Sequence, residues 1–160
     1  MKDSVNVREA QLADSGLVLE FIKRLAAYEE REDQVAADEA AIRKSIFEEK
    51  YAYGLLAELD GQTVGFAVYF FNYSTFLGRP GLYLEDVFVM PEHRGQGVGK
   101  AILRRLAQIA AEKDCGRMEW SCLKWNRSAI DFYLSLGAKD KNEWTVYSLN
   151  REKIEVLAQS

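Results

Sequence analysis

The chain reads LYLEDVFVMPEHRGQGVGKAILRRL between Leu82 and Leu106, and this stretch decides the fold. Its first part is almost continuously apolar and predicts a buried strand up to Met90, interrupted only by two adjacent carboxylates, Glu85 and Asp86. Carboxylates are costly to bury and disfavour strands, so a pair of them inside such a run requires an explanation. A glycine-rich bend and an amphipathic helix are predicted to follow the strand.

The glycine-rich bend predicts a binding site for an anion. Three glycines at alternate positions open the predicted helix: Gly95, Gly97 and Gly99. They leave backbone N–H groups unobstructed at the positive end of the helix dipole, which favours a phosphate or pyrophosphate. The Walker pattern fails because Arg94 and Ala101 occupy two of its defining positions, and the glycine spacing does not fit a dinucleotide fingerprint. These mismatches argue against a nucleotide-binding module.

The composition favours one soluble domain and disfavours nucleic-acid and membrane partners. The chain has 160 residues, of which 48% are hydrophobic, so we expect a single domain over residues 1–160. A net charge of −4 disfavours a nucleic-acid or acidic-membrane partner. The longest apolar run, Phe66 to Phe71, is too short to cross a bilayer, and Arg8, Glu9 and Asp14 interrupt any apolar leader. We therefore expect a cytoplasmic protein without a membrane partner.

The metal-binding side chains are too sparse for a zinc site. Two cysteines, Cys115 and Cys122, lack C-x-x-C spacing, and His93 is the single histidine. We expect no metal and two free thiols in a reducing compartment.

The remaining patterns predict alternating strands and helices. Strands are expected at 5–8, 55–59, 63–73, 118–123 and 143–149, and helices at 13–28, 38–47, 97–113 and 127–136, with a short charged helix closing the chain. The pair Asp60-Gly61 predicts a hairpin turn, and Asp38 is a suitable N-cap. This order predicts an α/β protein with a mixed sheet covered by helices on both faces.

Two motifs resemble those of one enzyme family. The first, RGQGVG at 94–99, is similar to the R-x-x-G-x-G pyrophosphate loop of the GNAT acyl-CoA-dependent N-acetyltransferases. The second, NRSAIDFY at 126–133 followed by Gly137-Ala138, is similar to the N-x-x-A-x-x-F-Y-x-x-x-G-A pattern that GNAT enzymes carry after the next strand. The resemblance implies the GNAT fold, with a mixed, mostly antiparallel twisted sheet. It also implies acetyl transfer from acetyl-CoA to an amine by direct attack in a ternary complex.

Further matches resemble one branch of that family, the diamine (spermidine/spermine) and thialysine acetyltransferases. They include YLED at 83–86, WN at 125–126 and AYE at 27–29. This resemblance implies a small cationic amine as acceptor and a homodimer. Ser74 and Phe76 stand where the polyamine enzymes have an acid and a tryptophan, which makes a lysine-like acceptor a competitor. A protein or peptide acceptor and a non-catalytic CoA-binding regulatory module remain as alternatives.

The resemblance also implies roles for individual residues. Glu85 is the candidate general base, with a pKa expected to be raised by burial, although it could instead be a structural carboxylate. Tyr133 is the candidate general acid. Expected cofactor contacts are Val87, Phe88, Val89, Arg94, Gly95, Gln96, Gly97, Val98, Gly99, Lys100, Asn126, Arg127, Ser128 and Ala129. Expected substrate contacts are Tyr28, Glu29, Glu85, Asp86 and Glu143. The neighbours Glu30, Glu32 and Asp33 are expected to be solvated surface.

Overall fold

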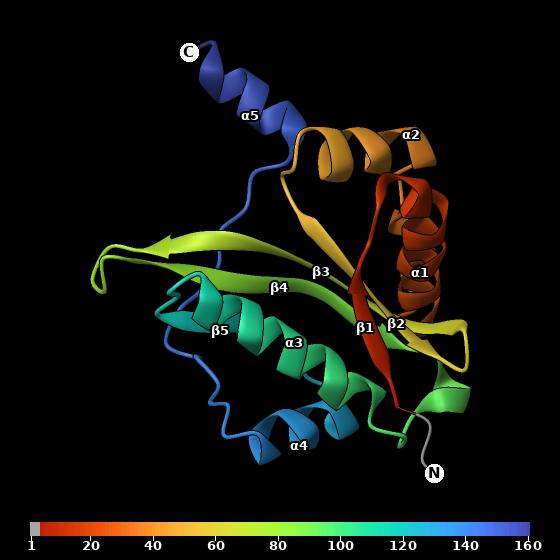
Figure 1. The fold of residues 1–160 in the computed structure, drawn as a ribbon. Coiled ribbons are helices and arrows are strands. Elements are labelled where there is room, and N and C mark those ends of the chain that lie inside the picture. The colour runs from red at the N-terminus through yellow and green to blue at the C-terminus, as the bar shows by residue number, and fades with distance from the viewer. Residues whose placement is uncertain (1–3) are drawn as a thin grey trace. The chain divides into compact units, whose positions relative to one another are not determined.

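The computed structural model describes residues 4–160 and contains a five-stranded mixed sheet with helices (Figure 1). The strands are β1 (Asn6–Glu9), β2 (Tyr53–Leu59), β3 (Gln62–Ser74), β4 (Arg79–Val89) and β5 (Arg117–Trp120). They lie in the order β1-β2-β3-β4-β5, with every neighbouring pair antiparallel except β4 and β5, which are parallel. The predicted α/β class with a mixed, mostly antiparallel sheet is therefore confirmed.

The α-helices also lie close to their predicted positions. They are α1 (Ser15–Tyr28), α2 (Glu39–Ile42), α3 (Val98–Glu112), α4 (Arg127–Ser135) and α5 (Arg151–Ala158). Short helical turns are η1 (Leu12–Asp14), η2 (Glu32–Gln34), η3 (Arg43–Glu48) and η4 (Pro91–His93). None of the helices within residues 4–160 has the length and apolar character needed to cross a bilayer.

The chain divides into two compact units with a boundary between Ser121 and Cys122. The first unit contains the sheet, α1, α2 and α3, and the second contains α4 and α5.

In the first unit, helices cover both faces of the sheet (Figure 1). On one face, α1 packs on β3, where the rings of Phe21 and Phe66 lie with centroids 5.5 Å apart and are buried. On the other face, α3 approaches β3 so closely that a Cβ at Gly65 would lie 3.2 Å from Val98 and 3.3 Å from Ile102. This burial on both faces explains why β3 and β4 are apolar along most of their length.

Local turn and cap signals are confirmed in this unit. Asp60 and Gly61 have φ angles of 53° and 74°, the left-handed pair that a two-residue hairpin turn requires. Asp38 caps α2 by accepting a hydrogen bond from the Ala41 amide at 2.8 Å. The predicted helix at 38–47 is present, although its second half is the π-helical turn η3.

In the second unit, α4 has both of its predicted ends. Its cap, Asn126, accepts a hydrogen bond from the Ala129 amide. The helix stops at Gly137, which has a φ of 88°, and the amide of Ala138 bonds back to the Tyr133 carbonyl at 3.2 Å.

One predicted element is absent from the second unit. Residues 143–149 do not form a strand, and no strand pairing within residues 4–160 includes them. A strand requires a neighbouring backbone for its hydrogen bonds, so an alternating apolar pattern alone does not create one. The predicted strand at 143–149 is therefore wrong for the single chain, while the closing helix is confirmed as α5.

Candidate active site

The glycine-rich bend presents free backbone amides at the start of α3. Gly95 and Gly97 have φ angles of 77° and 84°, which residues with a Cβ rarely adopt. The first bond of the helix runs from the Ala101 amide to the Gly97 carbonyl at 3.0 Å. Within residues 4–160 the amides from Gly95 to Lys100 have no hydrogen-bond acceptor. These N–H groups and the helix dipole provide the donors that a pyrophosphate needs.

Arg94 fastens this loop to the neighbouring elements. Its guanidinium carbon lies 4.5 Å from the ring centroid of Tyr28 and 5.5 Å from that of Phe88. Its Nε donates to the Val89 carbonyl at 3.1 Å. Cation–π contact therefore joins the end of α1 to the end of β4 beneath the loop, a positioning role that the sequence pattern did not reveal.

The strand β4 has an open edge immediately before this loop. Its first half pairs with β5 from Gly81 to Leu84, but β5 ends at Trp120. From Asp86 to Val89 the strand pairs with β3 alone among the described residues. The pairing of β4 with β5 therefore ends just before the residues of β4 that were expected to contact the pantetheine arm of CoA. The backbone groups of β4 on the β5 side are unpaired there.

Strand alternation shows which amides of β4 face the open edge. The Met90 amide bonds to Val64 of β3 at 2.8 Å, and Phe88 stands opposite Phe66 in the same register. Since backbone groups alternate in direction along a strand, the amides of Val87 and Val89 point away from β3. The Phe88 amide points toward β3. Of the three residues expected to contact a thioester and its pantetheine arm, Val87 and Val89 therefore have the suitable direction.

A β-bulge separates the two carboxylates of β4. Val68 of β3 stands opposite Asp86, whereas the next residue of β3, Tyr69, stands opposite Leu84. Glu85 is thus the extra residue, and its side chain is exposed. The expected burial of Glu85 is wrong, because the bulge turns this residue out of the pleat.

Asp86 has the environment that was expected for Glu85. It is half-buried, and its pKa is raised to about 6, first by desolvation and then by the negative charges of Glu85 and Glu29. A carboxylate with a pKa in this range can accept a proton near neutral pH. The family resemblance implies a substrate contact, not a base, for Asp86. The adjacent pair of acids was the available signal, but a bulge cannot be read from it.

Three acidic residues of the first unit, Glu29, Glu85 and Asp86, lie close enough to one another to interact electrostatically. Glu29 caps the end of α1, follows Tyr28 and is half-buried, and its charge acts on Asp86 together with that of Glu85. Three carboxylates around one point favour a cationic ligand.

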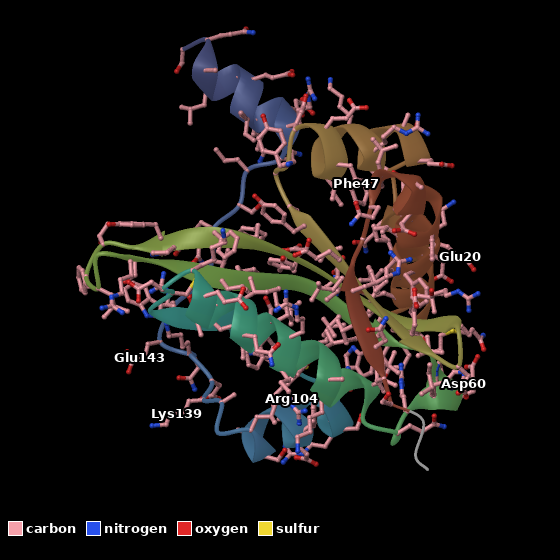
Figure 2. All side chains as sticks on the ribbon, in the orientation of Figure 1. Glu20, Phe47, Asp60, Arg104, Lys139 and Glu143 are labelled. Carbon is pink, nitrogen blue, oxygen red and sulfur yellow. The ribbon has the colours of Figure 1, made fainter. Side chains whose placement is uncertain are left out.

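The expected surface residues Glu30, Glu32 and Asp33 are exposed. Glu143 lies in the second unit with its side chain exposed, and Figure 2 labels it.

The second signature motif lies on α4. Tyr133 is half-buried, and desolvation, with a smaller contribution from Cys122, raises the pKa of its phenol to about 12. The phenol therefore stays protonated throughout the neutral range and can donate a proton. At the other end of the helix, the expected cofactor contacts include the cap Asn126 and Arg127, which pairs with Asp131 at 3.0 Å.

Relatives of known activity match this chain over nearly its full length. It is 40% identical to thialysine N-epsilon-acetyltransferase of Sus scrofa, covering 97% of this chain and 98% of the relative. It is 35% identical to human spermidine/spermine N(1)-acetyltransferase-like protein 1 over 98% of this chain, which corresponds to 24% of that longer relative.

Solved structures share the fold. An integron cassette protein from V. cholerae superposes with a TM-score of 0.80 at 28% identity, covering 98% of this chain and 99% of that one. An aminoglycoside N-acetyltransferase in complex with CoA superposes with a TM-score of 0.74 at 18% identity, covering 94% and 97% of the two chains. Residues 19–138, which include both signature motifs, match the model of the acetyltransferase (GNAT) family. The chain belongs to the GNAT family and is an N-acetyltransferase.

Proposed function

We propose that this enzyme transfers the acetyl group of acetyl-CoA to a primary amine of a small cationic acceptor, a diamine, a polyamine or a lysine-like compound. The observation that supports this most directly is the placement of three carboxylates beside the open edge of β4 and the free amides of the α3 loop. The family match crosses the boundary between the two units, which supports one domain over residues 1–160. We further propose a cytoplasmic location, a compartment in which thiols stay reduced. We also propose a homodimer.

The residues of the first unit suit the parts of CoA. The amides from Gly95 to Lys100 would hold the pyrophosphate, and the N–H groups of Val87 and Val89 would contact the pantetheine arm and the thioester carbonyl. Acetyl-CoA supplies the acyl group in activated form, and a strand N–H on the carbonyl oxygen stabilises the negative charge that develops there. In the second unit, Asn126, Arg127, Ser128 and Ala129 are proposed contacts on the pantetheine side.

The acceptor must lose a proton before it can attack. An alkylammonium has a pKa of about 10, so a base is needed at neutral pH. We assign this role to the carboxylate pair of the bulge, with Asp86 as the better candidate because its raised pKa lies closer to neutrality, and Glu85 as the alternative. The remaining carboxylates, together with Tyr28 and Glu143, would hold the cationic acceptor. Tyr133 Oη would donate its proton to the departing sulfur in direct transfer without an acyl-enzyme.

The pH dependence of two variants distinguishes the candidate bases. We expect kcat/KM of the wild type to fall below about pH 6, and Asp86→Asn to move activity toward the pKa of the free amine, near pH 10. Glu85→Gln should still lose kcat/KM below about pH 6, because Asp86, the carboxylate that titrates in this range, remains. Initial rates across the pH range would show this, and a profile altered only by Glu85→Gln would transfer the base role to Glu85.

Unfolding of the same variants provides a control that does not depend on activity. The folded protein holds a proton on Asp86 more tightly than the unfolded chain does. Ionisation of Asp86 therefore lowers the free energy of unfolding as the pH rises: the loss is absent below about pH 4 and complete near about pH 8. Asp86→Asn should therefore be more stable than the wild type by roughly 1–2 kcal/mol at about pH 8, and equal to it at about pH 4. An equal stability difference at both pH values would contradict the raised pKa.

Thiol release from acetyl-CoA tests the function as a whole. We expect turnover with one or more of spermidine, a short diamine, thialysine, lysine and ornithine, because the site combines carboxylates with the open edge of β4 and the free amides of the α3 loop. A peptide with a free N-terminus and a lysine side chain serves as the alternative acceptor. Preference for the peptide would indicate a protein acetyltransferase, and tight CoA binding without turnover of any amine would indicate a regulatory module.

A further inference from the structure

The exposed face of α3 carries two positive charges next to the α3 loop. Lys100 lies in the first turn of the helix, and Arg104, labelled in Figure 2, lies four positions further on, so both side chains project from one face. Both residues are exposed. Within residues 4–160 neither side chain takes part in an ion pair or a hydrogen bond. Both charges are therefore available to a ligand.

These two charges oppose the electrostatic preference of the helix. The N-terminus of a helix is its positive end and favours anions, yet α3 has no acidic residue in its first turn and has Lys100 there. A second cation four positions later adds repulsion between like charges. The single acid of α3, Glu112, is the last residue of the helix and pairs with Arg105 at 3.5 Å. Lys100 and Arg104 are therefore left without a compensating negative charge among the described residues.

CoA contains a phosphate group that would supply this negative charge. The backbone amides of the α3 loop suit its diphosphate. A second group, a phosphate monoester, is attached to the 3′ oxygen of the CoA ribose, and such a monoester carries a charge of about −1.5 to −2 at neutral pH. One ribose ring separates the two groups, a distance comparable to one helical turn of about 5.4 Å. A ligand held by its diphosphate at the loop therefore brings its monoester within reach of the first two turns of α3.

The direction of helical side chains favours the same placement. A long side chain on a helix leans toward the N-terminus and covers the turn before its own Cα. Arg104 thus covers the first turn, and Lys100 covers the end of the glycine-rich loop. A guanidinium can donate two parallel hydrogen bonds to phosphate oxygens, and an ammonium provides a compact charge beside them.

We propose that Lys100 and Arg104 bind the 3′-phosphate of CoA and make the enzyme selective for CoA over 3′-dephospho-CoA. This inference rests on the proposed use of acetyl-CoA. It adds an anion site built from side chains beside the pyrophosphate site, which is built from backbone amides. The two sites can be tested separately, because substitution of these side chains leaves the amides of the loop in place.

Binding of CoA and of 3′-dephospho-CoA tests the assignment. By titration calorimetry we expect the wild type to bind CoA at least about 20-fold more tightly than 3′-dephospho-CoA. Lys100→Gln and Arg104→Gln should each raise the dissociation constant of CoA by about 5–10-fold, and leave that of 3′-dephospho-CoA within about two-fold of the wild type. The double variant should bind the two ligands with similar affinity.

Lys113→Gln is the matched control for charge. It removes one positive charge at the C-cap of the same helix, about 14 Å beyond Arg104 along the axis. This separation exceeds the Debye length of about 8 Å at physiological ionic strength, so the control should keep the wild-type preference. All three substituted residues are exposed, so the variants should fold, which circular dichroism would verify.

Several results would overturn this inference. Equal binding of the two ligands by the wild type would mean that the monoester is not recognised, and the acetyltransferase proposal would stand. A preference retained by the double variant would place the monoester elsewhere, and an equal loss of affinity for both ligands would assign the two side chains to the diphosphate or to the conformation of the loop. A preference lowered as much by Lys113→Gln would indicate general charge attraction. A wild type that binds neither ligand would contradict the proposed use of acetyl-CoA as well.

Discussion

Gly97→Val is expected to raise the dissociation constant of CoA by about 100-fold or more while the protein remains folded. Gly97 has a φ of 84°, a conformation that costs a β-branched residue roughly 1–3 kcal/mol. The substituted backbone would relax out of this conformation and turn the amides of the α3 loop away from the pyrophosphate. Since a hydrogen bond to a charged group contributes about 1.5–3 kcal/mol, loss of one or two such bonds accounts for the expected change. Titration calorimetry with CoA would measure it.

Gly61 provides a matched control, because it has a similar backbone conformation but lies outside the proposed CoA site. Gly61 has a φ of 74° in the turn between β2 and β3, and as at Gly97 a Cβ there would meet no atom within 4 Å. Gly61→Val should lose a similar amount of stability, about 1–2 kcal/mol, and bind CoA as the wild type does. If both variants bound CoA equally well, the α3 loop would not be the pyrophosphate site.

Tyr133→Phe is expected to lower kcat by about 10²–10³-fold while leaving the affinity for CoA within about two-fold of the wild type. The phenol has a pKa raised to about 12, so it is available as a proton donor at every pH at which the enzyme would work. Without it, the sulfur must leave as a thiolate or take its proton from water. Steady-state kinetics together with CoA titration would separate the two quantities.

Tyr73→Phe is a suitable comparison for this variant. Tyr73 lies near the end of β3 with 61% of its surface exposed and belongs to neither signature motif. Its variant should retain wild-type kcat. A Tyr133→Phe enzyme with normal kcat would exclude the general acid role, and a large loss of CoA affinity would mean that Tyr133 is a structural residue.

Features that depend on neighbouring residues could be predicted from the sequence. The Asp60-Gly61 turn, the Asp38 and Asn126 caps and the stop at Gly137 each depend on the conformational preferences of residues within four positions of one another. The two signature motifs likewise lie in short continuous stretches, so they were sufficient to predict the family. The sheet class followed from the order of these elements.

Features that depend on distant residues required the tertiary structure. Glu85 and Asp86 are adjacent in sequence, yet the bulge opposite Val68 and Tyr69 exposes the first and partly buries the second. The pKa of Asp86 then depends on desolvation and on the charge of Glu29, which belongs to another element.

The sequence by itself determined the family, the order of elements and the glycine loop, because each is encoded in short-range conformational preference. The tertiary structure decided which carboxylate has a raised pKa, which amides of β4 face the open edge, and that the strand pattern at 143–149 pairs with no strand within residues 4–160. The reason is physical: hydrogen-bond pairing and desolvation are properties of the surroundings, and for these residues the surroundings come from distant parts of the sequence.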